Sequence, residues 1–174
     1  MRISILGLPG SGKSYLARAI AEQQHIPHIH IDRFWLEAGG RQGSHDTHNV
    51  DHVRAHVREK VLEAIQADAW VSDGVYSRVQ PEIANRADIL IFLDIPPWRR
   101  LLNHAWRIIT RDQRHEEITF WDDIRFFLEI IRRDRQHKSE KIREFLKEYR
   151  DKTVVLRSRK EINTYLQSLI RNAV

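Results

Sequence analysis

The chain contains no cysteine among its 174 residues. This absence excludes disulfide bridges, zinc sites built from thiolates, iron–sulfur clusters and cysteine nucleophiles. Long apolar runs are also missing, since none approaches the roughly 20 residues that a membrane-spanning helix needs. The apolar stretch within residues 1–7 is too short for a signal peptide, and glycine-rich sequence follows it at once. We therefore expect a cytoplasmic protein with no membrane partner.

The length and charge of the chain narrow the expectation further. With 174 residues, of which 41% are hydrophobic, the sequence fits one domain covering residues 1–174. Basic residues number 29 and acidic residues 24, which gives a formal charge of +5 and mildly favours polyanionic partners. Within residues 99–114 only Asp112 opposes a group of arginines: Arg99, Arg100, Arg107, Arg111 and Arg114. This segregation predicts a surface that faces an anion.

Short apolar runs alternate with longer amphipathic stretches, which is the pattern of an α/β protein with a parallel sheet. The run at 89–93 is apolar at every position, as expected of a strand covered on both faces. The predicted strands are 2–6, 28–32, 69–72, 89–94 and 153–157. The predicted helices are 13–24, 49–67, 97–111, 120–135, 138–150 and 159–171.

Residues 7–14 read Gly-Leu-Pro-Gly-Ser-Gly-Lys-Ser and match the phosphate-binding loop GxxxxGK[ST]. Backbone N–H groups of such a loop, together with the N-terminus of the following helix, point at phosphate oxygens. We predict that Lys13 bridges the β- and γ-phosphates of ATP as a catalytic residue, and that the Ser14 hydroxyl ligates Mg²⁺. The residues assigned to the nucleotide site here are Gly7, Pro9, Gly10, Ser11, Gly12, Lys13, Ser14 and Tyr15.

Three carboxylates lie at or just after predicted strand ends, where parallel α/β sheets bind their ligands. Asp73 suits a second Mg²⁺ anchor, because the metal needs hard oxygen ligands; the alternative is a helix cap or an Asp-Gly turn. Asp32 suits a substrate hydroxyl, as ligand or as general base; the alternative is a helix N-cap. Asp94 fits a cap and an indirect metal contact equally well.

Two other readings of the polar residues are less favoured. A GTPase switch would need Asp-x-x-Gly after the third strand, whereas Asp73 and Gly74 are adjacent, and residues 85–88 lack the lysine of Asn-Lys-x-Asp. Histidines at spacings of three and four would align on one helical face that zinc can use, although exposed imidazoles are ordinary on helices. These histidines are His45, His48, His52 and His56. The aromatic residues Trp98, Trp106 and Trp121 are expected in the core.

Five segments, taken in order, resemble a known family. They are the phosphate loop, residues 30–35 (His-Ile-Asp-Arg-Phe-Trp), residues 70–76 (Trp-Val-Ser-Asp-Gly-Val-Tyr), residues 91–96 and residues 154–162. Together they are similar to the small P-loop proteins called DNA topology modulation proteins, of the adenylate-kinase-like branch, over most of the chain. The resemblance implies a three-layer fold of nucleoside-monophosphate-kinase type, with helices on both faces of a five-stranded parallel sheet of order 2-3-1-4-5. It also implies phosphoryl transfer from ATP.

The resemblance extends to further site residues. Arg78 is placed like the acceptor-binding arginine of such kinases, so Asp32 and Arg78 are our substrate-binding candidates. Arg107 and Arg111 resemble the arginines that open a mobile lid and neutralise the transferring phosphoryl group; the alternative is a solvated basic face. The lid-like insert would cover about residues 107–125. Arg157, after the last strand, is placed by position at the adenine site.

The sequence therefore favours a kinase that uses ATP and Mg²⁺ and phosphorylates a small acceptor, a nucleotide or nucleoside-like molecule. Two alternatives stay open: an ATP-regulated protein that binds nucleic acid, and an ATPase without an acceptor. No nucleic-acid-binding module is recognisable, which makes a nucleic-acid partner the less favoured of the readings. Neither the oligomeric state nor the acceptor follows from the residues.

Overall fold

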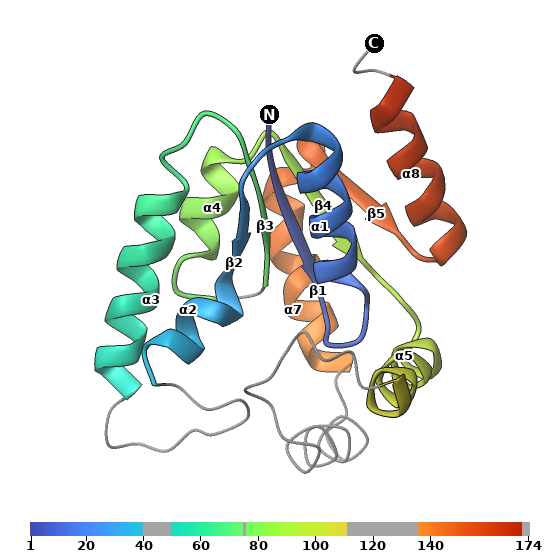
Figure 1. The fold of residues 1–174 in the computed structure, drawn as a ribbon, viewed down its shortest axis with the longest axis horizontal. Helices are drawn as coiled ribbons and strands as arrows, with labels where there is room; N and C mark the ends of the chain where they lie inside the picture. The colour runs from blue at the N-terminus through green and yellow to red at the C-terminus, as the bar shows by residue number, and fades with distance from the viewer. Residues whose placement is uncertain (40–49, 75, 111–135, 172–174) are drawn as a thin grey trace.

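The computed structural model describes residues 1–39, 50–74, 76–110 and 136–171. Five parallel strands form one sheet of order β2-β3-β1-β4-β5. The strands are β1 (Arg2–Gly7), β2 (His28–His30), β3 (Trp70–Asp73), β4 (Ile89–Leu93) and β5 (Thr153–Leu156). Their carboxyl ends meet at the lower edge of the sheet in Figure 1, where the phosphate loop, α2 and α5 also lie. The predicted strand order is confirmed.

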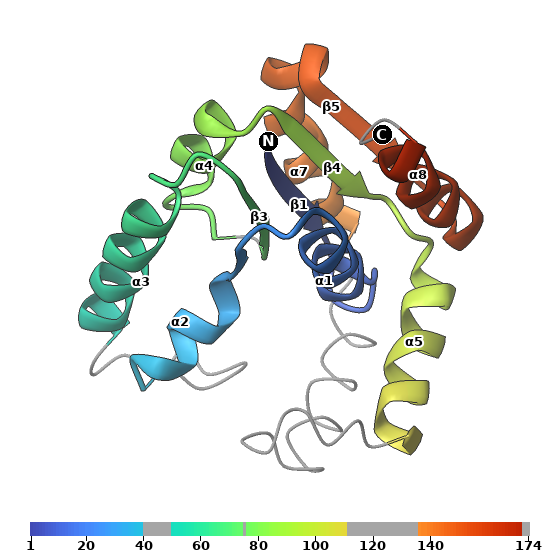
Figure 2. The ribbon, with the colours of Figure 1, turned by 45° about the horizontal axis from the view of Figure 1, so that its top comes forward.

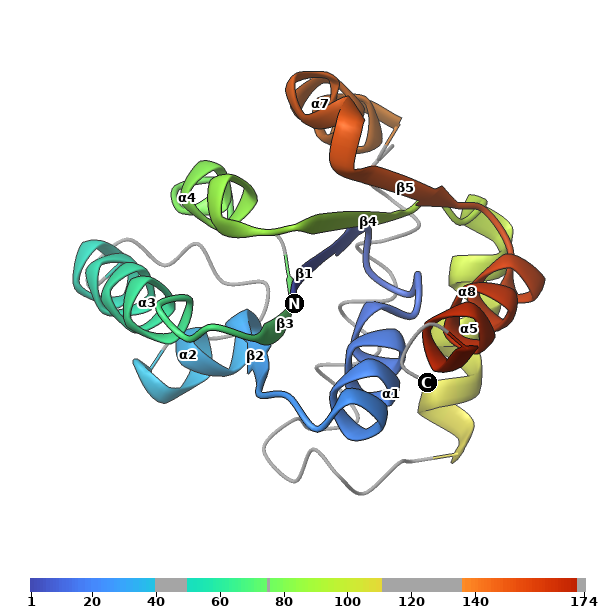
Figure 3. The same cartoon turned by 90° about the horizontal axis from the view of Figure 1, so that it is seen from above.

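Helices cover both faces of this sheet, so the predicted three-layer α/β architecture is confirmed. On one face α1 (Lys13–Gln24) and α8 (Arg159–Arg171) pack against side chains such as Ile5 and Ile91. On the other face α3 (Val50–Ala64), α4 (Gln80–Arg86) and α7 (Gln136–Leu146) pack against Leu90 and its neighbours. The view from above shows α1 and α8 on the side of the sheet opposite α4 and α7 (Figure 3). Alternate residues of each strand supply the two cores, because side chains in a strand point to opposite faces.

The predicted strand at 28–32 is wrong in its second half. β2 ends at His30, and Ile31–Glu37 forms the short helix α2. The His30 side chain caps this helix by accepting a hydrogen bond from the Arg33 N–H at 3.2 Å. An ion pair between Arg33 and Glu37, one turn apart, adds local support. Local capping therefore overrides the apolar–polar alternation that suggested a longer strand.

Two further segments differ from the prediction. Helix α4 falls in a stretch for which no helix was predicted, because its seven residues carry too little periodicity to reveal it. The helix predicted at 138–150 ends early: α7 stops at Leu146, and a 3₁₀ helix, η1 (Lys147–Lys152), leads into β5. The helix predicted at 120–135 lies outside the described residues.

Helix α5 (Pro97–Thr110) leaves the carboxyl end of β4 and runs away from the sheet (Figure 2). It begins in a turn in which the N–H groups of Arg99 and Arg100 both donate to the Pro96 carbonyl. Among the described residues, no helix is both long enough and apolar enough to cross a membrane. The position of α5 brings residues 99–110, the described part of the arginine-rich segment, to the same edge as the phosphate loop.

Candidate active site

The phosphate loop joins β1 to α1 in a shape that only glycine permits at two points. Gly12, the N-cap of α1, has φ 93°, in the left-handed region, and has no side chain with which to cap the helix. A Cβ on Gly7 would lie 2.7 Å from the Ser11 hydroxyl and 3.0 Å from the Leu93 carbonyl. The loop therefore leaves the N-terminal amides of a 12-residue helix for an anion, as the sequence motif predicts.

Lys13 lies in this loop with its ammonium folded back over it. Its Nζ donates to the Leu8 carbonyl at 3.3 Å, and the side chain is half-buried. Burial lowers the pKa of the Lys13 ammonium, while the carboxylates of Asp32 and Asp73 act to raise it and Arg100 acts to lower it. The ammonium thus sits between two carboxylates and a guanidinium, in an environment that a polyphosphate would complete.

Asp73 is the last residue of β3, and its carboxylate is 2% exposed. The Ser14 hydroxyl donates to Oδ2 at 2.5 Å, and Nε2 of His28 lies 2.8 Å from Oδ1. Burial acts to raise the pKa of Asp73, but the hydrogen bonds from His28 and Ser14 outweigh it and hold the pKa below its usual range. The two residues predicted to anchor Mg²⁺ are in direct contact.

The oxygen atoms of Ser14 and Asp73 fit a magnesium ion. Both are hard ligands of the kind that Mg²⁺ prefers, and they lie side by side next to the phosphate loop. The sequence predicted these two residues. It did not identify His28, whose only signal was a place on a predicted strand two residues before His30.

Helix α5 places two side chains near the phosphate loop that sequence reasoning did not single out. The Asn103 side-chain amide donates to the Gly10 carbonyl at 2.8 Å and so ties the helix to the phosphate loop. Arg100 lies one turn earlier on the same helical face, is 6% exposed, and is close enough to Lys13 to lower its pKa. The arginine cluster in the sequence was the signal for this residue, but nothing there distinguished Arg100 from its neighbours.

Of the two predicted lid arginines, one has no described side chain and the other lies beyond the described residues. Arg107 is within α5, and its side chain is not among those described. Arg111 lies outside the described residues, as do positions 111–125 of the predicted lid-like insert. Their assigned roles stay predictions.

The predicted acceptor residues lie on the side of the carboxyl edge that faces α2 and α4. Asp32 is exposed in the first turn of α2, so it neither ends a strand nor serves as the N-cap, which is His30. Arg78 is exposed just before α4. Close to it in the chain, the Tyr76 hydroxyl and both side-chain heteroatoms of Gln80 are buried with no hydrogen-bond partner. Buried polar groups of this kind usually meet a ligand or water.

Asp94, directly after β4, is held by two arginines. Arg143 donates to both of its carboxylate oxygens, at 2.8 and 2.9 Å, and Arg157 lies 3.8 Å from Oδ2. These arginine contacts account for the Asp94 carboxylate, and the indirect metal contact considered for it stays a prediction. Arg157 is exposed and belongs to a turn closed by a capping box, in which Ser158 and Glu161 bond reciprocally at the start of α8.

Two minor predictions can also be placed. Within the described ranges, no group of three or more histidine, aspartate or glutamate side chains is arranged to hold a metal ion, and His45 and His48 lie outside those ranges. Trp98, expected in the core, is 56% exposed, with the Arg99 guanidinium 4.9 Å from its ring centroid. That expectation was wrong for Trp98; the side chains of Trp106 and Trp121 are not described.

Comparison with known proteins supports the fold. The chain is similar to a shikimate kinase from Bacteroides thetaiotaomicron whose crystal structure is known, with a TM-score of 0.59 and 21% identity over 99% of this chain and 98% of that one. No protein-family model matches the sequence, and no curated protein matches it. The fold is thus that of the P-loop kinases of nucleoside-monophosphate-kinase type, and the resemblance to DNA topology modulation proteins stays a prediction.

Proposed function

We propose that this protein is a phosphotransferase that uses ATP and Mg²⁺ to phosphorylate a small acceptor, a nucleotide or a nucleoside-like molecule. The observation that carries the proposal is the contact between Ser14 and Asp73 beside the half-buried ammonium of Lys13. A glycine-rich loop alone indicates phosphate binding. A hydroxyl and a carboxylate that meet next to its lysine add a place for the metal that accompanies a triphosphate.

The donor would be held by the loop amides, by Lys13 and by Arg100. Bound Mg²⁺ would neutralise charge on the phosphate oxygens, with Ser14 and Asp73 as its protein ligands. Two cationic side chains beside one loop favour a chain of several phosphates over a single one. Tyr15, exposed in the first turn of α1, and Arg157 are our candidates for contacts with the remainder of the nucleotide.

The acceptor would enter from the side of Asp32 and Arg78. If it presents a hydroxyl, Asp32 takes the proton as that oxygen bonds to the γ-phosphorus and the bond to the ADP oxygen breaks. If it presents a phosphate, the nucleophile is already anionic and no base is needed. Arg107 and Arg111 stay candidates for stabilising charge during transfer.

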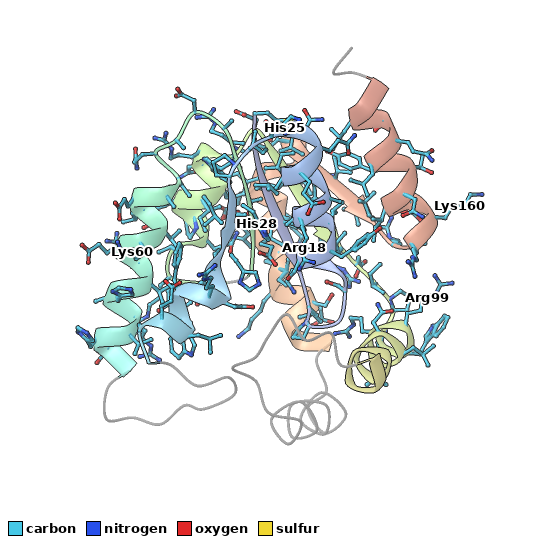
Figure 4. The ribbon with its side chains drawn as sticks, viewed as in Figure 1. Arg18, His25, His28, Lys60, Arg99 and Lys160 are labelled. Carbon is cyan, nitrogen blue, oxygen red and sulfur yellow. The ribbon has the colours of Figure 1, made fainter. Side chains whose placement is uncertain are left out.

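Nucleotide binding can be tested with Lys13→Ala, by calorimetry with ATP and Mg²⁺. We expect the dissociation constant of ATP to rise by about 10- to 100-fold, because a charge-assisted contact to phosphate is lost. Lys60→Ala is the matched control, since Lys60 is half-exposed on α3 and pairs with Glu63 one turn along the same helix (Figure 4). Wild-type affinity in Lys13→Ala would refute the proposed donor site.

The transfer itself is tested by ADP release over a panel of nucleotides, nucleosides and small polyols. A kinase shows ADP release that one acceptor accelerates, together with a phosphorylated product. Hydrolysis that no acceptor accelerates would instead identify an ATPase. A steep dependence of DNA affinity on salt, with no transfer to any small molecule, would favour the nucleic-acid-binding alternative.

A further inference from the structure

His28 lies outside every motif in the sequence, yet it touches the centre of the candidate metal site. It is on β2, and its Nε2 is 2.8 Å from Oδ1 of Asp73, while the other carboxylate oxygen of Asp73 accepts from Ser14. The two oxygens of one buried carboxylate are thus engaged by two different side chains. In Figure 4, His28 lies in the middle of the molecule beside α1, whereas His25 lies at the far end of that helix.

Strand pairing explains how a residue so early in the chain reaches Asp73. β2 and β3 are parallel neighbours, with His28 in register with Val71 and His30 with Asp73. Because side chains alternate along a strand, His28 and Asp73 point to the same face of the sheet, the face that α1 covers. His30 also lies on this face, but its ring serves as the cap of α2. Only His28 of the pair donates to the carboxylate.

The direction of the hydrogen bond follows from the chemistry of Asp73. An aspartate carboxylate is ionised near neutral pH, and in that form its oxygens can only accept hydrogen bonds. Nε2 of His28 therefore carries the proton in this contact. The His28 side chain is 21% exposed and the Asp73 side chain is 2% exposed. Water therefore does not readily replace His28 as the hydrogen-bond donor.

We infer that His28 is a positioning residue for the metal site: its ring N–H holds Oδ1 of Asp73, which leaves Oδ2 facing the Ser14 hydroxyl and the Mg²⁺ position. The inference rests on the proposed function, since it gives the Ser14–Asp73 pair its role in metal binding. Carboxylate ligands are commonly fixed by such outer hydrogen bonds. Loss of an outer partner typically weakens metal affinity or activity by about 10- to 100-fold.

Three variants separate this role from a general structural one. His28→Leu removes the donor and retains a side chain of moderate size. His28→Gln places an amide N–H where Nε2 stands, and restores the hydrogen bond if donation is what matters. His25→Asn is the control, because His25 is exposed and its φ of 53° is one that asparagine tolerates.

The measurement is metal affinity rather than turnover. Mn²⁺ binding to the protein with ATP is followed by electron paramagnetic resonance, and ATP binding without metal by calorimetry in EDTA. We expect His28→Leu to raise the dissociation constant of Mn²⁺ by about 10- to 100-fold and to leave metal-free ATP affinity unchanged. His28→Gln should recover most of the loss, and His25→Asn should match the wild type.

Each other outcome has one meaning. Unchanged Mn²⁺ affinity in His28→Leu overturns the inference while leaving the proposed function in place. Failure of the wild type to bind ATP under either condition overturns the proposed function instead. If circular dichroism shows that His28→Leu does not fold, His28→Gln is compared with His28→Asn, whose side chain is shorter. Weaker Mn²⁺ binding in His28→Asn than in His28→Gln supports the inference. Equal Mn²⁺ affinities in these two variants would also overturn it.

Discussion

The two ends of the candidate site are built differently. The donor end, consisting of the phosphate loop, Asp73 and the first two turns of α5, is joined by direct contacts: Ser14 with Asp73, and Asn103 with Gly10. The proposed acceptor end, consisting of Asp32 and Arg78 with Tyr76 and Gln80, has exposed charges and buried polar atoms without partners. The Ser11 hydroxyl in the phosphate loop is also buried without a partner, so both ends keep polar groups for a ligand. What distinguishes the donor end is the set of direct contacts that joins its elements.

This difference teaches how the two ends relate to their ligands. Polyphosphate is the same in every nucleotide, so the groups that bind it can be fixed by backbone shape and buried pairs. An acceptor is recognised by side chains whose buried polar atoms gain partners only when the right molecule binds. Substitutions at the donor end should weaken the reaction with every acceptor, and substitutions at the acceptor end should act on some acceptors only.

The largest effect is expected from Arg100, which would break the donor end. Arg100→Met removes a buried cation next to Lys13 and keeps most of the side-chain volume. We expect the dissociation constant of ATP to rise by about 10- to 100-fold, and that of AMP to change much less, because a charge-assisted contact with the outer phosphates is lost. Calorimetry with ATP, ADP and AMP measures this gradient.

Arg99→Met is the control for that experiment. Arg99 is the neighbouring residue, but its side chain is exposed at the edge of the molecule, with its guanidinium over the Trp98 ring (Figure 4). The Arg99→Met variant should bind ATP, ADP and AMP with the affinities of the wild type. Equal losses of ATP and AMP affinity in Arg100→Met would mean that Arg100 supports the loop in general rather than the outer phosphates.

An intermediate effect is expected from Arg78, which sharpens the comparison at the acceptor end. Arg78→Ala should raise the KM of an anionic acceptor about tenfold and leave the affinity for ATP unchanged. A tenfold change corresponds to the loss of roughly 1.4 kcal/mol, the size expected for an exposed charge-assisted contact. Steady-state kinetics with the acceptor found in the ADP-release panel measures it. Arg58→Ala is the control, because it removes an arginine that pairs with Glu82. The KM of the acceptor should not change in this variant. A rise in the dissociation constant of ATP in Arg78→Ala would contradict the division between the two ends.

The smallest effect is expected from acid, through Asp73. Its pKa is lower in the folded protein than in the unfolded chain, so its ionised form stabilises the fold above the unfolded pKa, and this stabilisation disappears as pH falls through the folded pKa. Burial opposes the hydrogen bonds, which keeps the effect small. Denaturant unfolding of the wild type and Asp73→Asn from neutral pH to pH ~3 should show a difference in free energy that shrinks in acid.

Asp68→Asn, at an exposed carboxylate, controls for the general effect of removing one negative charge. If the difference between wild type and Asp73→Asn grew in acid, the stated direction of the pKa shift would be wrong.

The parts of this protein that sequence reasoning predicted share a local signal. The alternation of apolar runs and amphipathic stretches identified the strands and most of the helices, and four specified positions identified the phosphate loop. Asp73 was found because it directly follows a predicted strand, and parallel sheets bind their ligands at the carboxyl ends of their strands. The errors came from segments too short for a period to show, since both α2 and α4 have seven residues.

The contacts that sequence reasoning missed lack such a signal. His28 and Asp73 are 45 positions apart, and Asn103 and Gly10 are 93 apart. Neither pair belongs to a motif, and each depends on which strands are neighbours and on the direction in which α5 leaves β4. Arg100 was visible only as one of several arginines, because burial of a single member of a charged cluster is a property of packing.

By itself, the sequence determined a parallel α/β fold and a loop that can bind phosphate, because periodicity and glycine placement act over a few residues. Only the tertiary structure decided which side chains surround that loop. A flexible chain, with 3.8 Å between consecutive Cα atoms, can bring almost any two distant residues together. Strand order and helix direction determine which pairs actually meet. The carboxylate of Asp73 therefore became a site through neighbours that lie far from it in the chain.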